Sequence, residues 1–275
     1  MARPLAPPAK PVSPLRLRIV SALVLGPLVL AMVWLRGAFL DALMLAAVAL
    51  MGWEWARLAG RGAFGATGLA VIVAMEGAMG ALALGEGGIA CGVAAAGALL
   101  VGAMARFVRG EPAWAAGGTL WITLAALSFL WLAQVPGGGR ETAFWLLGLV
   151  WANDIAAYAV GRAVGGPKLA PRWSPKKTWA GFFGGVISAG LFGLLWSGVV
   201  WQHNTSVAIV SALLAMAAQL GDLAESLAKR HFGVKDSSWL IPGHGGLLDR
   251  VDGLMAASMV AGAVSLAIGR GPSAW

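Results

Sequence analysis

Acidic side chains near the C-terminal end of the sequence have types and spacings that could hold a divalent cation. Asp222 and Glu225 are three residues apart in the segment GDLAES, and Asp249 and Asp252 repeat that spacing in LDRVD. Residues three apart in a helix share a face, so each pair of carboxylates can point the same way. Magnesium prefers hard oxygen ligands and is usually bound through a few carboxylates together with substrate phosphates. The two pairs therefore predict a magnesium site, which Asp154 from an earlier apolar segment can join.

The segment between these acid pairs carries basic residues and glycines that suit a phosphate group. Lysine and arginine side chains neutralise phosphate oxygens, and the glycines of GHGG let backbone amides approach an anion. A helix beginning after this turn would direct its positive N-terminal end toward the same anion. His244 could donate to a phosphate or orient another ligand. The expected anion-binding residues of this segment are Lys229, Arg230, Lys235, Gly245, Gly246 and Arg250.

A second polar segment, residues 162–179, contains the sequence SPKKT. Its proline is expected to shape a turn, and Ser174, Lys176 and Lys177 are suited to bind a phosphate. Basic loops are common beside membrane spans, so this motif alone is a weak indication of a site. Asp154 is more informative, because an acid within an apolar segment needs a partner, a cavity or a metal.

Composition places these polar segments in a membrane protein. Hydrophobic residues make up 59% of the 275-residue chain and charged residues 12%, about half the charged share of a typical soluble domain. A helix of about 20 mostly apolar residues spans a bilayer, so the sequence predicts an all-α, polytopic membrane protein. We expect a disordered cytoplasmic tail at residues 1–16 and one helical domain at residues 17–275. The nine predicted spans are residues 17–35, 39–57, 67–85, 87–106, 115–134, 143–163, 180–200, 205–228 and 248–269.

The distribution of positive charge predicts how the chain crosses the membrane. If the spans alternate and the N-terminus lies inside, the inside segments hold seventeen lysines and arginines and the outside segments hold three. This asymmetry fits the positive-inside rule, so the N-terminus and the polar segments at residues 162–179 and 229–247 are expected to face the cytoplasm. The spread of these cations over short segments suits anionic headgroups and argues against a nucleic-acid partner.

Several other polar residues have simpler structural explanations. His203 is expected to be solvated in a short outside loop, whereas the role of His231 stays open. Cys91 is the only cysteine and is expected to be a small buried residue. Three further acids are expected to pair with neighbouring residues and to anchor helix ends. These acids are Asp41, Glu54 and Glu76.

Residues 226–252 resemble the signature of the phosphatidate cytidylyltransferases, also called CDP-diacylglycerol synthases, in the segment SLAKRHFGVKDSSWLIPGHGGLLDRVD. That signature reads S-x-hydrophobic-K-R, four residues, K-D-x-small, and then P-x-H-G-G-x-x-D-R-x-D. The segments GDLAES, DIAAYAVGR and SPKKTWAG are similar to further family motifs, so the resemblance covers roughly residues 150–255. It implies that these residues form the catalytic part of the helical domain. Two positions depart from the pattern. Ala228 stands where a larger apolar residue is usual, and Ala180 stands where glutamate is common, which removes one carboxylate.

The resemblance implies transfer of a cytidylyl group from CTP to phosphatidic acid, giving CDP-diacylglycerol and pyrophosphate in phospholipid biosynthesis. It implies a multi-pass protein of the bacterial cytoplasmic membrane that meets CTP, phosphatidic acid and membrane lipids, and it leaves a homodimer open. Mg²⁺ is the implied cofactor, and a second, monovalent ion is left open. The metal ligands would come from Asp154, Asp222, Glu225, Asp249 and Asp252. The catalytic residues would be Lys235, His244, Asp249 and Arg250, and the substrate-binding residues Ser174, Lys176, Lys177, Lys229, Arg230, Gly245 and Gly246.

Two other functions suit a membrane protein with intramembrane acids. The CDP-alcohol phosphatidyltransferases have a signature resembling D-G-x-x-A-R, eight residues, G-x-x-x-D-x-x-x-D, which cannot be placed in this sequence. An ion-coupled transporter would spread its acids at mid-membrane on broken helices in two matched halves. Here the acids instead gather beside a phosphate-type loop, so cytidylyl transfer is the favoured hypothesis.

Overall fold

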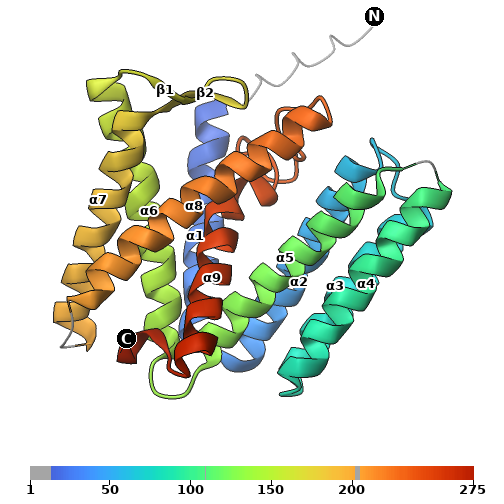
Figure 1. The fold of residues 1–275 in the computed structure, drawn as a ribbon, viewed down its shortest axis with the longest axis horizontal. Coiled ribbons are helices and arrows are strands. Elements are labelled where there is room, and N and C mark those ends of the chain that lie inside the picture. Colours follow the sequence, from blue (N-terminus) through green and yellow to red (C-terminus); the bar gives the residue numbers. More distant parts are fainter. Residues whose placement is uncertain (1–13, 109, 202–204) are drawn as a thin grey trace, which may run out of the picture.

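The protein is a bundle of long helices (Figure 1). The structure is a computed structural model, and it describes residues 14–108, 110–201 and 205–275. Within these ranges nine helices are long and apolar enough to span a membrane, which confirms the predicted all-α, polytopic class. They are α1 (Pro14–Leu35), α2 (Gly37–Ala59), α3 (Gly65–Ala83), α4 (Gly87–Phe107), α5 (Pro112–Gln134), α6 (Gly139–Val164), α7 (Trp179–Trp196), α8 (Ser206–His231) and α9 (Leu248–Ile268).

The helix ends follow the predicted spans closely, with one clear difference at the N-terminus. Helix α1 begins at Pro14, so the expected disorder is wrong for residues 14–16. Proline is favoured in the first turn of a helix, where its missing N–H would have no partner. The rest of the predicted tail and His203 lie outside the described residues. Helix α7 continues into a π-helical turn, Ser197–Trp201, and a short 3₁₀ turn, Pro272–Ala274, follows α9.

The polar segment between α6 and α7 contains two short strands that the sequence did not predict. Strands β1 (Lys168–Ala170) and β2 (Ser174–Thr178) form an antiparallel hairpin. The expected turn at the proline of SPKKT is wrong, because Pro175 lies within β2 and Pro171 lies in the turn between the strands. Proline suits the second position of a turn, and within sheets it is tolerated at edges, where an N–H is dispensable. Pro171 therefore shapes the turn, whereas Pro175 is part of a strand.

The order of the helices in space brings the hairpin and the segment 232–247 to the same end of the bundle (Figure 1). Helix α8 crosses the bundle obliquely between them and packs against both α7 and α9. Helix α9 also packs on α5, which in turn packs on α2, while α3 and α4 form one edge. The C-terminus lies at the opposite end. The acids of α8 and α9 are thereby placed close to both polar segments.

Helices α6 and α7 approach closely because glycines line their contact. A Cβ atom on Gly181 would lie 2.6 Å from the carbonyl oxygen of Ala157. A Cβ atom on Gly184 would lie 2.7 Å from the Cβ of Val160. Both distances are too short for real side chains, so glycine at these two positions is what lets the helices approach so closely.

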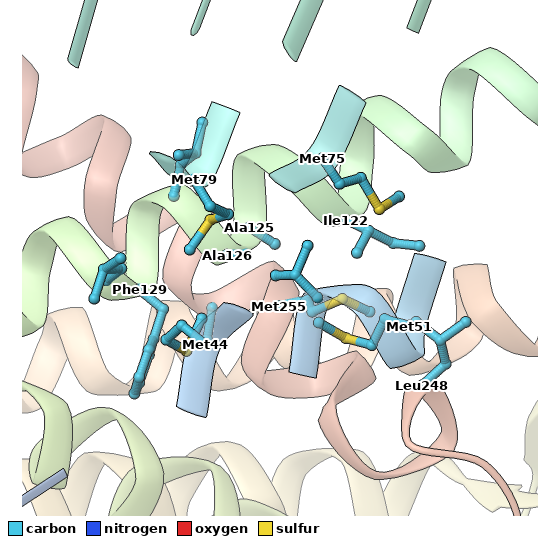
Figure 2. Packing of buried hydrophobic residues seen from close by; sticks show 14 of the residues in the cluster. Met44, Met51, Met75, Met79, Ile122, Ala125, Ala126, Phe129, Leu248 and Met255 are labelled. Carbon is cyan, nitrogen blue, oxygen red and sulfur yellow. The ribbon is translucent and has the colours of Figure 1, made fainter. Parts of the chain in front are cut away.

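The apolar core joins the two halves of the chain. Methionines of α2 and α3 meet residues of α5 and α9 there, and methionine side chains adapt well to irregular gaps between helices. Figure 2 shows this packing, with Leu248 and Met255 of α9 beside Met51 of α2. Leu248 is 2% exposed and is also the first residue of α9, so the start of this helix is fixed against the N-terminal half.

Cys91 is exposed on α4, so its predicted burial is wrong. A small apolar residue suits a helix face that meets lipid as well as it suits a protein core. Helix α4 lies at the edge of the bundle, where one of its faces has no protein neighbour (Figure 1).

Candidate active site

Asp249 is the centre of the polar segment between α8 and α9. Its Oδ2 accepts hydrogen bonds from the backbone N–H of Gly246 at 2.8 Å and from the N–H and hydroxyl of Ser237 at 3.0 and 3.1 Å. Its Oδ1 accepts from Nζ of Lys229 at 2.5 Å. The Asp249 side chain is only 3% exposed. Asp249 therefore ties the end of α8, the loop and the start of α9 together.

Lys229 lies between two carboxylates and not at an open surface. Its Nζ is 2.5 Å from Oε2 of Glu225, one helical turn earlier on α8, as well as from Asp249. Its side chain is 12% exposed. Lys229 was expected to bind the substrate, but in this arrangement its charge is already matched by two acids. A buried cation needs such partners, because an unpaired charge away from water is costly.

Glu54 of α2 occupies the N-terminal end of α9. Its carboxylate accepts hydrogen bonds from the backbone N–H groups of Leu247 and Leu248, both at 2.8 Å, and from the hydroxyl of Ser238 at 2.5 Å. Glu54 is fully buried. The first amides of a helix and its positive end attract an anion, and here a protein carboxylate is that anion. Glu54 therefore anchors the start of α9, but the expected pairing with a neighbouring residue is wrong, because its partners lie far along the chain.

The two adjacent glycines of GHGG, Gly245 and Gly246, are required by these protein carboxylates. A Cβ atom on Gly246 would lie 1.9 Å from Oγ of Ser237 and 2.6 Å from Oε1 of Glu54. Gly245 has φ +89°, and a Cβ there would be 3.0 Å from Oδ2 of Asp249. The N–H of Gly245 donates to the carbonyl of Ile241 at 3.2 Å. The amides of Gly245 and Gly246 are thus already bonded within the protein, which differs from the expectation that they stay open for a substrate anion.

Helix α1 holds the other side of the same turn. Nε of Arg18 donates to the carbonyl oxygen of Gly243 at 2.7 Å, and Oγ of Ser21 lies 2.9 Å from Nδ1 of His244. The half-buried His244 is therefore oriented by α1, and its Nδ1 is engaged with a protein hydroxyl. Nothing in the sequence indicated that the first span contributes to this segment.

A second group of acids lies beside Asp249 and has few protein donors. Asp154 of α6, Asp222 of α8 and Asp252 of α9 are close enough to interact electrostatically. Lys177 of the hairpin reaches Asp222, with 2.6 Å between its Nζ and Oδ2 of the acid. The convergence of three helices on one acidic group was predicted for these residues. The pairing of Lys177 with an acid was not predicted.

Two buried side-chain amides, Asn153 and Gln219, form a chain of hydrogen bonds that ends at Asp154. Nδ2 of Asn153 donates to Oδ1 of Asp154 at 3.0 Å. Nε2 of Gln219 donates to Oδ1 of Asn153 at 2.9 Å and to the carbonyl of Phe182 at 3.1 Å. Helices α6, α7 and α8 are linked in this way at the depth of the acids. Sequence reasoning missed both amides, although a buried glutamine within an apolar span is itself a visible signal.

The remaining basic residues at this end differ in how far they are engaged. Lys176 and Lys235 are exposed, and their side chains make no hydrogen bond or ion pair with residues that the structure describes. The guanidinium of Arg230 donates to the carbonyl of Val234 at 3.0 Å. Arg250 is exposed and interacts electrostatically with Asp154. Among the described residues it forms no ion pair with Asp252, two positions later in the motif. Half-buried Ser174 begins β2 beside them.

The donor chemistry of the acids fits a hard cation, although they do not form a complete ligand cage. No group of three His, Cys, Asp or Glu side chains has metal-binding geometry within residues 14–108, 110–201 and 205–275. Apart from the ion pair with Lys229, the two buried oxygens of Glu225 have no hydrogen-bond partner in that part of the chain. Magnesium keeps several waters and shares substrate phosphates, so a few such carboxylates suit it. Asp249 fits less well, because Oδ2 already accepts three hydrogen bonds.

His231, left open by the sequence, has a structural role at the edge of this end. Its Nε2 lies 2.5 Å from Oε2 of Glu111, and its ring stacks on Trp114 with 4.7 Å between centroids. Arg61 donates to the other oxygen of Glu111 at 2.6 Å. The hydrogen bonds from His231 and Arg61 hold the pKa of Glu111 below its ordinary value. These contacts join α8 to the loops of the N-terminal half.

The other two acids that were expected to anchor helix ends behave differently from each other. Asp41 accepts a hydrogen bond from Nε2 of Gln134 at 2.6 Å, so it is paired across two helices and not, as expected, with a neighbour in the sequence. Glu76 does not meet the expectation either, because its buried Oε1 has no hydrogen-bond partner among the described residues.

Comparison with known proteins identifies the family of this chain. A sequence model described as "Cytidylyltransferase family" matches residues 16–267. A protein of Brucella suis named phosphatidate cytidylyltransferase is 40% identical over 250 residues, which cover 90% of this chain and 91% of the relative. A protein of Pseudomonas aeruginosa with the same name is 38% identical over 272 residues, or 94% of this chain and 99% of the relative. The match spans nearly all of the helices and the whole candidate site. The chain therefore belongs to the cytidylyltransferase family.

Proposed function

We propose that the protein transfers the cytidylyl group of CTP to phosphatidic acid and releases pyrophosphate. The observation that carries this proposal is the similarity over at least 90% of the chain to proteins named phosphatidate cytidylyltransferase. The site adds physical support, since it combines carboxylates and exposed cations at one end of an apolar bundle. A substrate that is partly lipid and partly phosphate is suited to such a boundary.

The reaction needs no nucleophile from the protein. An ionised phosphate oxygen of phosphatidic acid attacks the α-phosphorus of CTP, and the bond from that phosphorus to the oxygen of the β-phosphate breaks. Positioning and neutralisation of charge are then the main requirements. Lys176, Lys235, Arg230 and Arg250 carry exposed cationic groups near the acids and would hold the phosphates. Lys229 would act indirectly, by fixing Glu225 and Asp249 in place.

Asp222, Glu225 and Asp252 would hold Mg²⁺, and Asp154 lies close enough to assist them. Asp249 lies beside this group, but its Oδ2 is occupied by protein hydrogen bonds. A bound Mg²⁺ would neutralise the phosphates of CTP and of the departing pyrophosphate. The protein residues prepare this position, because the mutual repulsion of three nearby carboxylates is relieved when a cation binds between them. A second, monovalent ion and a homodimer stay predictions from the resemblance.

The proposed orientation puts the site on the cytoplasmic face of a bacterial inner membrane. The end that carries the hairpin and residues 232–247 belongs to the side with seventeen of the twenty lysines and arginines under the nine-span topology. CTP is a cytoplasmic nucleotide, so this orientation gives it direct access, while the acyl chains of the lipid stay in the bilayer.

The experiment uses the full chain, purified in detergent, with radiolabelled CTP and phosphatidic acid. We expect label in a CDP-diacylglycerol product that extracts into organic solvent, release of pyrophosphate, and loss of both when Mg²⁺ is chelated. Replacing phosphatidic acid with CDP-diacylglycerol and an alcohol acceptor tests the related phosphatidyltransferase reaction. Label that stays in water with phosphatidic acid as the acceptor would contradict the proposal.

A further inference from the structure

A second polar hollow lies at the end of the bundle opposite the acids. It has a volume of about 410 Å³, and its lining includes Arg36 between α1 and α2, Arg140 in the first turn of α6, and Gly137 and Gly138 just before that helix. Trp201 closes one side. None of these residues belongs to the candidate active site. The hollow therefore needs an explanation of its own.

The two arginines of this hollow have no anionic partner in the described part of the chain. Nε of Arg140 is buried without a hydrogen bond, and its guanidinium lies over the ring of Trp34 at 4.7 Å from the centroid. The guanidinium of Arg36 lies against Gly139, where an added Cβ would be 2.9 Å from Nη2. Glu141 also lines the hollow but pairs with neither arginine. The group keeps a net positive charge beside an apolar surface.

The position of these arginines is unusual for the charge pattern of the chain. Under the nine-span topology this end carries only three of the twenty lysines and arginines, namely Arg36, Arg140 and Arg270. Two of the three line the same hollow. Cations are disfavoured on that side of the membrane and at an apolar boundary, so two that converge indicate a bound anion.

The surroundings of the hollow indicate that the anion is attached to acyl chains. Trp34 and Leu35 at the end of α1 are 58% and 55% exposed, and Val199 beside the hollow-lining Val200 is 79% exposed. These side chains form an apolar surface that would meet lipid in the membrane. We propose that Arg36 and Arg140 bind the phosphodiester of a membrane phospholipid in the leaflet opposite the active site. Guanidinium groups match phosphate oxygens in both charge and geometry.

The test compares lipid retention by the full chain and a double variant, R36Q/R140Q. Protein purified in mild detergent is mixed with phosphatidylglycerol, and bound lipid is measured by native mass spectrometry. Loss of charge-assisted hydrogen bonds from two guanidinium groups should lower retention about tenfold or more. R270Q is the matched control, because it removes the third cation of the same end from outside the hollow. R36K/R140K keeps the charge and should recover part of the binding.

Three measurements make the outcome decisive. Cytidylyl transfer should stay within about twofold of the unmodified protein in R36Q/R140Q, since neither residue touches the proposed catalytic group. Equal lipid retention by R36Q/R140Q and R270Q would overturn the proposal. Displacement of the lipid by millimolar inorganic phosphate would also overturn it, because the site would then recognise free phosphate and not a phospholipid. If R36Q/R140Q does not fold, the single variants R36Q and R140Q replace it, and full lipid retention by both of them would overturn the proposal.

Discussion

Two sets of carboxylates lie side by side at the polar end of the bundle, and their environments differ. Asp249 and Glu54 accept hydrogen bonds from the backbone N–H groups of Ser237, Gly246, Leu247 and Leu248. Asp154, Asp222, Glu225 and Asp252 receive few protein donors and lie close to one another. The first set has its charge satisfied within the fold. The oxygens of the second set have few protein partners, so this is the set that can bind a cation.

This difference divides the motif LDRVD between two tasks. Asp249 faces the loop and Lys229, whereas Asp252 faces Asp222 of α8 and Asp154 of α6. Residues three apart in a helix lie on the same side of it, but that side of α9 contacts both the loop before α9 and the helices α6 and α8. The sequence assigned both acids to the metal. The structure gives Asp249 a scaffold role as well, and the following predictions separate the two roles by measuring stability and activity together.

Asp249→Asn should have the largest effect, because it changes both properties. The substitution removes one partner of the buried Lys229, and breaking a buried ion pair costs about 3 kcal/mol or more. Unfolding followed by circular dichroism in detergent should show this loss, and CDP-diacylglycerol formation should fall with it. A variant that loses activity while its unfolding transition is unchanged would mean that Asp249 is only a ligand, and the comparison between the two sets would fail.

Asp222→Asn should reduce activity without comparable loss of stability. Asp222 would hold the Mg²⁺ that neutralises the reacting phosphates, and loss of one such electrostatic contribution typically costs about 100-fold or more in rate. Its ion pair with Lys177 is partly exposed, so the pair contributes only about 0 to 1 kcal/mol, and relief of repulsion from Asp154 and Asp252 offsets this.

The matched control for Asp222→Asn is Asp41→Asn, an acid-to-amide change on α2 at a carboxylate that has one hydrogen-bond partner, Gln134, among the described residues. It should leave activity near that of the unmodified protein. If Asp222→Asn lowers the unfolding midpoint as much as Asp249→Asn, Asp222 contributes to the fold as Asp249 does, and the two sets of carboxylates do not differ in role.

Glu54→Gln should destabilise the start of α9 by about 2 kcal/mol, because a glutamine N–H would face a backbone N–H and leave a buried donor without an acceptor. Faster hydrogen exchange at the amides of Leu247 and Leu248 would report the local effect. Glu76→Gln is a close control on the neighbouring helix α3, since Oε1 of Glu76 has no described partner. Comparable destabilisation by both variants would show that burial and not these hydrogen bonds accounts for the effect.

Glu111→Gln should have the smallest effect, visible only in acid. The pKa of Glu111 is held below its ordinary value of 4.5 by hydrogen bonds from His231 and then Arg61. A lowered pKa in the folded state means that the ionised acid stabilises the fold above pH 4.5, and that this contribution is lost as the pH falls through the folded pKa. The variant should therefore lose part of the acid dependence of the unfolding midpoint. Glu86→Gln, at an exposed loop, should leave the pH profile unchanged.

Much of the architecture could be predicted because lipid imposes simple requirements on the sequence. The spans, their number and the polar end follow from apolar length and charge, since an unsatisfied backbone is not tolerated in a bilayer. The hairpin was missed because its strands are only three and five residues long, too short for a periodic pattern. Cys91 was misplaced because lipid-facing and core-facing residues are equally apolar.

By itself the sequence determined the family, the membrane fold and the acids that converge at one end, since spacing and residue type carry that information locally. Only the tertiary structure decided which acids are scaffold and which stay open, because their donors come from distant segments. Glu54 lies 193 residues before Leu247, whose N–H it accepts. Ser21 lies 223 residues before His244. Hydrogen bonds over such separations depend on how the helices pack, and no local pattern records that packing.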